Sequence, residues 1–504
     1  MPFRKIDMKN HSSDSYKHTL KYTSLFGGVQ GLSILIGMIR NKLVALILGP
    51  AGMGLVSLYN TTITLISTAT SLGMSMSGVK KVSETYEEKT NSARLGETVR
   101  LVRSLSVITA ILGVLVCLLF SRILSLLTFG NYSHTWAFVA LAPMVGMMAV
   151  ITGELAIMKG ARMLRQIAQV SIFNVVAALV ISVPLFFCYG WDGIIPSFLL
   201  LTLSQLVFTM KYSCRCFPWH VTLKWKFVSQ GRELFRLGVA FVLAGVFGTG
   251  ADFLIRLFLN NAGTLDAVGL YNAGYMMTMV YGGLVFSAME TDYFPRLSAV
   301  PADDVLTRND VVNKQVEVSL ILISPMLTVF ITFLPIILPM LFSSKFNAVL
   351  PMVQITVLAL YMRAMKLPLS YIALAKGDSK SFLFLEGTYA VVVFALVSFM
   401  FVMFGLTGTG YALLLTSVLD FIMLTVYTYY KYKYVMSRGV AIQAALMLPL
   451  GITACVASQT LHGAGYWVAG IFVSVVSFSV SFFFLHKKTH LMSALKKKIQ
   501  AKFF

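Results

Sequence analysis

The chain has 504 residues, of which 57% are hydrophobic and only 12% are charged. A water-soluble globular protein carries about 25% charged residues, so this composition excludes that class and indicates many membrane-spanning helices. The formal net charge of +21 does not call for nucleic acid as a partner, because membrane proteins concentrate Lys and Arg on their cytoplasmic side.

Apolar runs bounded by charged or turn residues predict about fourteen spans, since most runs reach the roughly 20 residues that a membrane helix needs. We therefore expect an all-α polytopic membrane protein. The first run follows polar residues without a small-residue cleavage site, so we expect it to stay in the protein. The predicted spans are 22–48, 53–79, 99–120, 136–158, 166–188, 193–212, 234–258, 266–289, 316–342, 348–374, 381–404, 409–430, 440–458 and 464–485.

The cations are distributed unevenly between the two predicted sides. With a cytoplasmic N-terminus, thirty-four of the 41 Lys and Arg residues fall in cytoplasmic loops and tails, and only Arg122 and Lys345 fall outside. This asymmetry is the positive-inside pattern. It predicts that both termini are cytoplasmic and that the protein spans a membrane many times.

Two stretches of the sequence resemble one another. Arg40 precedes GLVSLYNTT (54–62) much as Arg256 precedes GLYNAGYMM (269–277). This repeat predicts two pseudo-symmetric six-helix lobes around a central cavity. The predicted segments are an N-terminal tail (1–21), an N-lobe (22–213), a basic linker (214–233), a C-lobe (234–431), two additional spans (432–485) and a basic tail (486–504).

The linker contains the stretch RCFPWHVTLKWK (215–226), in which cations alternate with Trp219 and Trp225. Such a mixture is typical of an amphipathic segment on the inner leaflet. A specific role in holding a lipid headgroup is the alternative.

Several cations lie inside predicted spans, where each costs about 2.5–3.5 kcal/mol and usually faces a cavity or a partner. They include Arg40, Arg256 and Arg363. Lys366 follows Arg363 on the same helix face, and no acidic residue lies within a turn of either, so both are expected to be unpaired. These four side chains predict a cationic cavity for an anionic cargo. For Arg256, an ion pair with Asp252, one turn earlier, is the alternative.

Three acidic residues are candidates for coupling transport to a proton or a sodium ion. Asp420, near the middle of the twelfth span, is the best placed, and Asp252 and Glu154 are further candidates. The alternative for Asp420 is a neutral acid hydrogen-bonded to a neighbouring helix. The sequence contains no phosphate-binding loop, no HExxH motif and no credible Ser/His/Asp arrangement. We therefore expect transport without a cofactor or a metal, and no catalysis.

Three motifs point to a family. The turn GPAGMGL (49–55), the stretch TDYFPRLS (291–298) and the stretch HVTLKW (220–225) resemble the Wzx-type O-antigen and capsular polysaccharide flippases. These belong to the polysaccharide transporter family of the MOP (multidrug, oligosaccharidyl-lipid, polysaccharide) superfamily. The resemblance implies the MATE-like MOP fold. It also implies translocation of undecaprenyl-pyrophosphate-linked oligosaccharide from the inner to the outer leaflet of the bacterial inner membrane by alternating access.

The same resemblance implies roles and partners. Arg40, Arg256 and Arg363, assisted by Lys366, would engage the pyrophosphate and anionic sugars. The partners would be the lipid-linked oligosaccharide, membrane lipids and other polysaccharide-assembly proteins, without nucleic acid.

One departure keeps alternatives open, because many members of that family have twelve spans and this chain is predicted to have fourteen. Fourteen spans also resemble the lipid II flippases of peptidoglycan synthesis. A MATE-type multidrug exporter is a further alternative, although a basic cavity disfavours cationic drugs. A membrane-embedded polysaccharide polymerase or ligase is another, although the short outer loops disfavour it.

Overall fold

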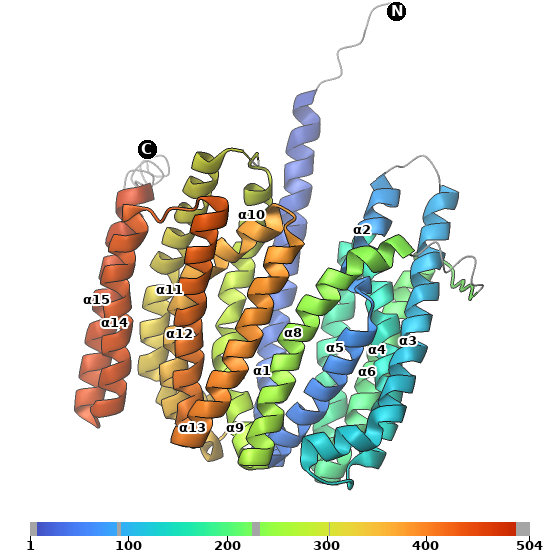
Figure 1. Cartoon of the computed structure of the whole chain (residues 1–504), viewed down its shortest axis with the longest axis horizontal. Coiled ribbons are helices and arrows are strands. Elements are labelled where there is room, and N and C mark those ends of the chain that lie inside the picture. Colours follow the sequence, from blue (N-terminus) through green and yellow to red (C-terminus); the bar gives the residue numbers. More distant parts are fainter. Residues whose placement is uncertain (1–7, 88–91, 224–231, 302, 490–504) are drawn as a thin grey trace, which may run out of the picture. The chain divides into compact units, whose positions relative to one another are not determined.

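The computed structural model describes residues 8–87, 92–223, 232–301 and 303–489, and nearly all of them are helical (Figure 1). No strand occurs among these residues, which confirms the all-α prediction. The last part of the predicted basic tail (490–504) and Trp225 of the predicted linker lie outside the described residues.

Ten helical segments of the described chain are long and apolar enough to cross a membrane, and three of them contain a break. Gly49 (φ 67°) and Gly405 (φ 60°) interrupt two of these segments in the left-handed region, which glycine adopts without a steric penalty. A 3₁₀ turn interrupts the third. The predicted count of about fourteen spans stays a prediction. The segments with breaks are α1 (Met8–Thr70), α13 (Ser379–Tyr432) and the pair α5 (Leu164–Tyr189) and α6 (Ile194–Cys216), joined by η1 (Gly190–Gly193).

The second span of each predicted lobe is interrupted, which the sequence did not predict. In the first case α1 ends at Thr70 and the chain resumes as α2 (Met74–Glu87). Between them lies Gly73 (φ 72°), where a Cβ atom would sit 2.4 Å from the Cα of Gly238, so only glycine permits this approach of two backbones. In the second case the predicted span is α9 (Leu265–Tyr275), the π-helix η3 (Met276–Tyr281) and α10 (Gly283–Ser298).

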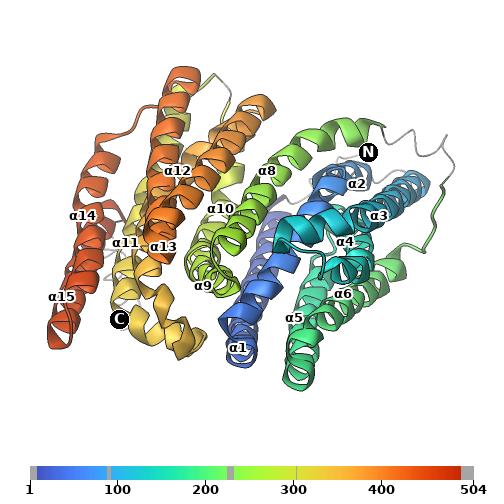
Figure 2. The ribbon, with the colours of Figure 1, turned by 60° about the horizontal axis from the view of Figure 1, so that its bottom comes forward.

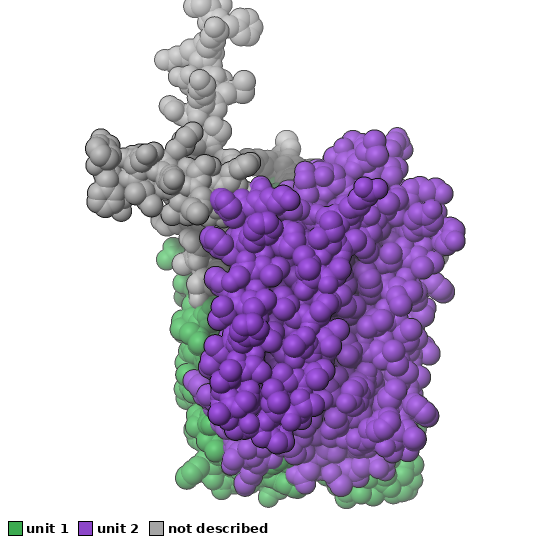
Figure 3. Space-filling model, turned by 90° about the vertical axis from the view of Figure 1, so that its left-hand side faces the viewer, with its two compact units in different colours: residues 1–52, 58–253 green, residues 53–57, 254–504 purple. Residues whose placement is uncertain are grey.

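The chain divides into two compact units, which Figure 3 shows in separate colours. The division falls inside α8, whereas the sequence predicts that the lobes join in the basic linker; the predicted lobe boundaries stay a prediction. Unit 1 comprises Met1–Gly52 and Leu58–Phe253, unit 2 comprises Met53–Ser57 and Leu254–Phe504, and α8 is Arg232–Ala262.

Unit 1 is organised around α4 (Thr135–Gly160), which packs against α2, α3 (Ser92–Phe129), α5 and α6. Most side chains of α4 are buried. Its sequence is apolar on all sides, as expected for a helix with neighbours around it. The one cation of α4, Lys159, lies in its last turn.

Unit 2 is organised around α12, which packs against α11, α13 and α14. Figures 1 and 2 both show α14 and α15 beside α11. Three helices of this unit begin where the side chain of Asp304, Asp378 or Ser437 accepts a hydrogen bond from a backbone N–H of the first turn. The elements are α11 (Val305–Leu341), η4 (Ser344–Val349), α12 (Leu350–Ala375), α14 (Arg438–Thr460) and α15 (Ala464–Thr489).

Candidate functional site

Arg363 lies on α12, where its guanidinium packs against the interrupted span of unit 2. Its Nη1 donates a hydrogen bond to the carbonyl oxygen of Met279 in η3 (3.2 Å), and its Cζ lies 5.2 Å from the centre of the Phe286 ring. Gly283 leaves room for this packing, since a Cβ atom there would lie 3.2 Å from Nη1. Arg363 forms no ion pair with any described residue. A half-buried positive charge therefore lies beside a broken helix, and no carboxylate of the described residues pairs with it.

Lys366, one turn further along α12, is ion-paired with Asp420 of α13. Both side chains are largely buried, at 19% and 12% exposed, and the Lys366 ammonium also lies 4.5 Å from the centre of the Tyr389 ring. Glu386 is close enough to interact electrostatically with both charged groups. The expectation that Lys366 is unpaired is therefore wrong: its partner is 54 residues away in the sequence and comes from a different helix. One carboxylate pairs with this ammonium here, and the carboxyl group of Glu386 lies near both charges.

Arg256, on α8, is buried in the place where the two repeated motifs meet. Its Nε donates to the Ser57 hydroxyl (2.8 Å) and its Nη2 to Oδ1 of Asn272 (3.3 Å). The Ser57 hydroxyl also donates to Oδ1 of Asn272 (3.0 Å). A Cβ atom at Gly54 would lie 3.1 Å from the backbone nitrogen of Gly269, so the two motifs are in backbone contact. The guanidinium of Arg256 thus binds both copies of the repeat.

The aromatic side chains of the second motif complete this environment. The Cζ of Arg256 lies 5.7 Å from the ring centre of Tyr271 and 5.3 Å from that of Tyr275. Arg256 is only 4% exposed. The predicted ion pair with Asp252, which is half-buried on α8, stays a prediction.

Arg40 lies in unit 1, in the part of α1 before the Gly49 break. Its Nε donates a hydrogen bond to the hydroxyl of Ser182 on α5 (2.9 Å). Ser182 is fully buried, and Arg40 is half-buried. Although Arg40 and Arg256 precede matching motifs, the structure gives them different neighbours.

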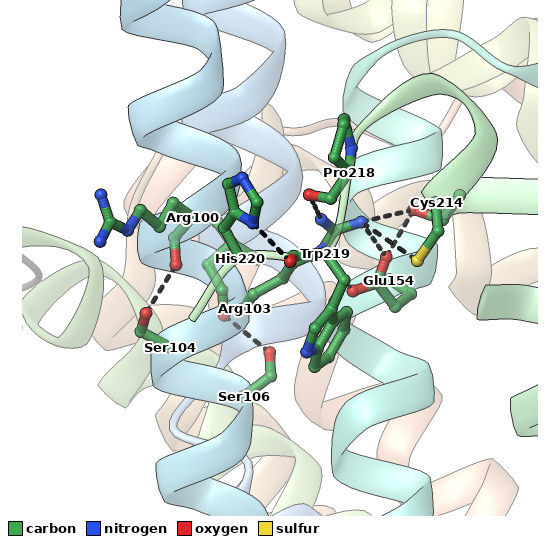
Figure 4. Close-up of polar contacts among 11 residues, drawn as sticks. Arg100, Arg103, Ser104, Ser106, Glu154, Cys214, Pro218, Trp219 and His220 are labelled. Atoms are coloured by element: carbon green, nitrogen blue, oxygen red, sulfur yellow. Dashed lines mark hydrogen bonds and ion pairs between the residues drawn. The ribbon is translucent and has the colours of Figure 1, made fainter. Parts of the chain in front are cut away.

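Glu154, a candidate for ion coupling, is held by an arginine that was not among the predicted site residues (Figure 4). Arg103 of α3 binds it with two hydrogen bonds, Nε to Oε1 (2.7 Å) and Nη2 to Oε2 (3.0 Å). Both side chains are 1% exposed. Ser213 donates a third hydrogen bond to Oε2. In this arrangement the charge of Glu154 is fully compensated.

Arg103 also binds the start of the predicted linker to the helices of unit 1. Its Nη1 donates to the carbonyl oxygen of Pro218 (2.6 Å), and its Cζ lies 5.0 Å from the Trp219 ring (Figure 4). The backbone N–H of Thr222 donates to the Ser104 hydroxyl (3.0 Å). Residues 217–223 are not helical. They are bound to the helices of unit 1, and the inner-leaflet placement predicted for this stretch stays a prediction.

Unit 2 contains a comparable arrangement, in which α11 holds the segment that follows α13. Asn313 is its centre: its Nδ2 donates to the carbonyl oxygen of Val435 (3.0 Å), and its Oδ1 accepts from the Tyr434 hydroxyl (2.9 Å) and the Ser437 N–H (3.0 Å). Glu317, one turn further, is ion-paired with Lys488 of α15. This cluster fixes the start of α14 and the end of α15 to α11.

The described residues contain no group of three His, Cys, Asp or Glu side chains that could hold a metal ion. The charged side chains inside the helices differ in two ways. Some cations have a carboxylate partner and others do not, and some carboxyl groups lie near a cation that already has another partner. Arg363 has no ion pair with a described residue, and in the Lys366–Asp420–Glu386 cluster two carboxyl groups lie near one ammonium.

Comparisons with known proteins identify a family and a fold. The sequence model of a family described as "Polysaccharide biosynthesis protein" matches residues 19–300, more than half of the chain. No curated protein matches the sequence. Among solved structures, the chain is similar to the lipid II flippase MurJ in an inward closed conformation, with a TM-score of 0.69 and 12% identity, over 92% of this chain and 99% of that chain.

Two further solved structures have the same fold. One is an inward-facing multidrug resistance MATE family transporter of the MOP superfamily (TM-score 0.62, 14% identity, 82% of this chain and 96% of that chain). The other is a MOP superfamily transporter from Pyrococcus furiosus Vc1 (TM-score 0.54, 13% identity, 81% of this chain and 93% of that chain). These similarities confirm the predicted MOP fold.

Proposed function

We propose that this chain, which belongs to the polysaccharide biosynthesis protein family, is a flippase for undecaprenyl-pyrophosphate-linked oligosaccharide. The cargo would be an O-antigen or capsule repeat unit, moved by alternating access from the inner to the outer leaflet of the bacterial inner membrane. The chain is a multi-pass membrane protein with the MOP fold. Family and fold together support a transporter of lipid-linked sugar.

The observation that carries the cargo assignment is that Arg363 has no ion pair with any described residue. A pyrophosphate is a compact dianion, and a guanidinium binds phosphate oxygens through two parallel hydrogen bonds. We propose Arg363 and Arg40 as the residues that contact the pyrophosphate, because both are half-buried guanidinium groups on apolar helices. Arg256 would position the two repeated motifs, and Lys366 would assist once released from Asp420.

The Lys366–Asp420–Glu386 cluster supports a coupling role for Asp420. When a proton or a sodium ion binds to one carboxyl group, the attraction that holds the Lys366 ammonium weakens. Lys366 then becomes available to an anionic cargo. Asp252 remains a second candidate for coupling. Glu154 is a weaker one, because two hydrogen bonds from Arg103 already compensate its charge.

A cell that lacks this chain tests the proposal. We expect loss of surface polysaccharide and accumulation of the lipid-linked oligosaccharide, since synthesis continues on the cytoplasmic side while transfer stops. Expression of the chain from a plasmid restores the polysaccharide. Unchanged surface polysaccharide in the deletion strain contradicts the proposal. Reporter fusions at the two termini test the proposed cytoplasmic location of both ends.

A lipid II flippase of peptidoglycan synthesis is the second candidate, favoured by the similarity to MurJ over 92% of the chain. Depletion of that activity prevents growth, so rescue of a flippase-depleted strain by this chain favours this alternative. A MATE-type exporter would instead confer drug resistance. A polysaccharide polymerase or ligase would alter a labelled lipid-linked sugar, whereas a flippase returns it unchanged. Contacts with other polysaccharide-assembly proteins remain part of the proposal.

A further inference from the structure

A pocket of about 470 Å³ opens in unit 2 where α14 turns into α15. The ends of α11, α12, α14 and α15 form its walls. Its volume falls in the range of about 300–1,000 Å³ that is typical of small-molecule sites. The turn lies at the opposite end of both helices from Arg438 and Lys488, which is the end that the cation distribution predicts to face outward.

The pocket is separate from the cations described above. Gln354, which lines the pocket, precedes Arg363 by nine residues on α12, a distance of about 14 Å along the helix. None of the residues in the proposed cargo-binding or coupling clusters lines it. The cargo-binding and coupling residues therefore do not account for this pocket.

The innermost polar group of the pocket is a donor without an acceptor. Gln354 is only 2% exposed, and its Nε2 atom is enclosed without a hydrogen-bond partner among the described residues. It lies beside the hydroxyl of Tyr466, which donates to the carbonyl oxygens of Ile331 and Thr332. Since buried donors are nearly always paired, this amide indicates a ligand that supplies an acceptor.

The rest of the lining combines an apolar surface with neutral polar groups. Trp467 and Pro351 provide the apolar surface, while Ser458, Gln459 and His462 lie around the opening. Hydroxyl and amide groups both donate and accept hydrogen bonds. In the described part of the chain, no Lys, Arg, Asp or Glu side chain contributes to this lining.

A sugar ring matches this chemistry. Its hydroxyl groups donate and accept, and its C–H groups form an apolar face that packs on an indole. A phosphate or carboxylate ligand would lack a cation, and an acyl chain would leave the Gln354 amide unpaired. We propose that this pocket binds a neutral monosaccharide unit of a glycan. Such binding requires neither transport nor a lipid-linked cargo, so it goes beyond the proposed function and is tested without it.

Titration of the purified full-length protein with single compounds tests the proposal. The panel consists of glucose, galactose, mannose, rhamnose, N-acetylglucosamine and inorganic phosphate, and the signal is tryptophan fluorescence. We expect at least one sugar to change the fluorescence saturably, phosphate to have no effect, and Trp467→Phe to remove the change.

The variant Gln354→Met keeps the size of the side chain and removes the amide. A site that hydrogen-bonds a ligand discriminates strongly when the bond is lost, so we expect its Kd for the sugar to rise about tenfold or more. Gln443→Met is the matched control, because Gln443 is a buried glutamine of α14 outside the pocket; its Kd stays at the wild-type value. If Gln354→Met fails to fold, Gln459→Leu at the opening serves instead, with a weaker loss expected.

Three results overturn the proposal. One is the absence of any sugar-dependent signal in the wild-type protein. Another is an unchanged Kd in the Gln354→Met variant, or in Gln459→Leu where that variant replaces it. The third is saturable binding of phosphate in place of sugar. None of these outcomes bears on whether the chain moves a lipid-linked oligosaccharide.

Discussion

Arg363 and Lys366 are three residues apart on one helix, yet their environments differ. Lys366 has a carboxylate partner, Asp420, whereas Arg363 donates to a backbone carbonyl and packs on an aromatic ring. A carbonyl dipole compensates only part of a full charge. Of this pair, Arg363 therefore retains the greater attraction for an anionic ligand.

The substitution Arg363→Ala tests this difference. We expect surface polysaccharide to fall to the level of the deletion strain, because the cation is lost. Arg363→Lys keeps the charge without the bidentate geometry and should support partial export. Surface polysaccharide is measured by gel analysis, with membrane levels of each variant as the control. Normal polysaccharide in Arg363→Ala would show that this side chain is dispensable.

The buried pair of Arg103 and Glu154 makes a prediction about stability. Removing one partner of a buried pair leaves an uncompensated charge, so Glu154→Gln should lower the free energy of unfolding by about 3–5 kcal/mol. The double variant Arg103→Met, Glu154→Met should lose less than that. Both are measured by chemical denaturation of the purified protein in detergent.

A matched control is the exposed ion pair of Lys314 and Asp310, whose side chains are 70% and 56% exposed. Asp310→Asn should change the free energy of unfolding by about 0–1 kcal/mol. If Glu154→Gln and Asp310→Asn lowered the free energy of unfolding equally, burial of the Arg103–Glu154 pair would add nothing to its contribution to stability.

The sequence could reveal these charged residues but not their partners. Arg363, Lys366 and Asp420 are visible because a charge inside an apolar run is unusual. The pairing of Lys366 with Asp420 is invisible, because 54 residues separate them and no helical spacing connects them. Arg103 is missed for another reason: it lies at the edge of an apolar run among the basic residues of a predicted cytoplasmic loop, where a cation is ordinary.

At the level of helices, the apolar runs predict most elements well, and the breaks poorly. The start of α13 follows from Asp378, a capping residue directly before an apolar run. The Lys431 ammonium and the Ser381 hydroxyl hold the pKa of this carboxyl well below its usual range. The interruption at Gly73 depends instead on the close approach of Gly238. These residues are far apart in the sequence, so no local sequence pattern predicts this contact.

The start of α4 makes a prediction about pH. His134 accepts or donates a hydrogen bond through Nδ1 with the Tyr59 hydroxyl (2.7 Å), and its ring stacks on Phe129. Burial lowers the pKa of His134 below its usual value of 6.5. Neutral His134 is therefore favoured in the folded state. Its contribution to stability is present above pH 6.5 and is lost as the pH falls towards its lowered pKa.

Thermal unfolding of the purified protein between pH 8 and pH 5 measures this effect. We expect the unfolding temperature of the wild-type protein to fall below about pH 6.5, and the fall to be smaller in His134→Phe. His462→Phe is the matched control, since His462 is exposed in a loop. An identical pH dependence in wild type and His134→Phe would refute the role of His134.

At the level of the whole molecule, one helix in each unit binds the segment that follows the predicted six-span lobe. Arg103 of α3 holds Pro218 after α6, and Asn313 of α11 holds Val435 after α13. The sequence repeat predicts two related lobes, and this is a second similarity between the two units. The fold class follows from hydropathy and the resemblance, whereas the exact span count depends on breaks that composition does not specify.

Movement of a lipid-linked oligosaccharide between leaflets by the purified chain is the most direct test of the proposed function. The purified protein is reconstituted in vesicles that carry labelled undecaprenyl-pyrophosphate oligosaccharide, and the fraction accessible to an external reagent is followed over time. We expect the wild-type protein to redistribute the unaltered lipid faster than protein-free vesicles do, and Arg363→Ala to match the protein-free rate. A wild-type rate equal to that of protein-free vesicles would contradict the account.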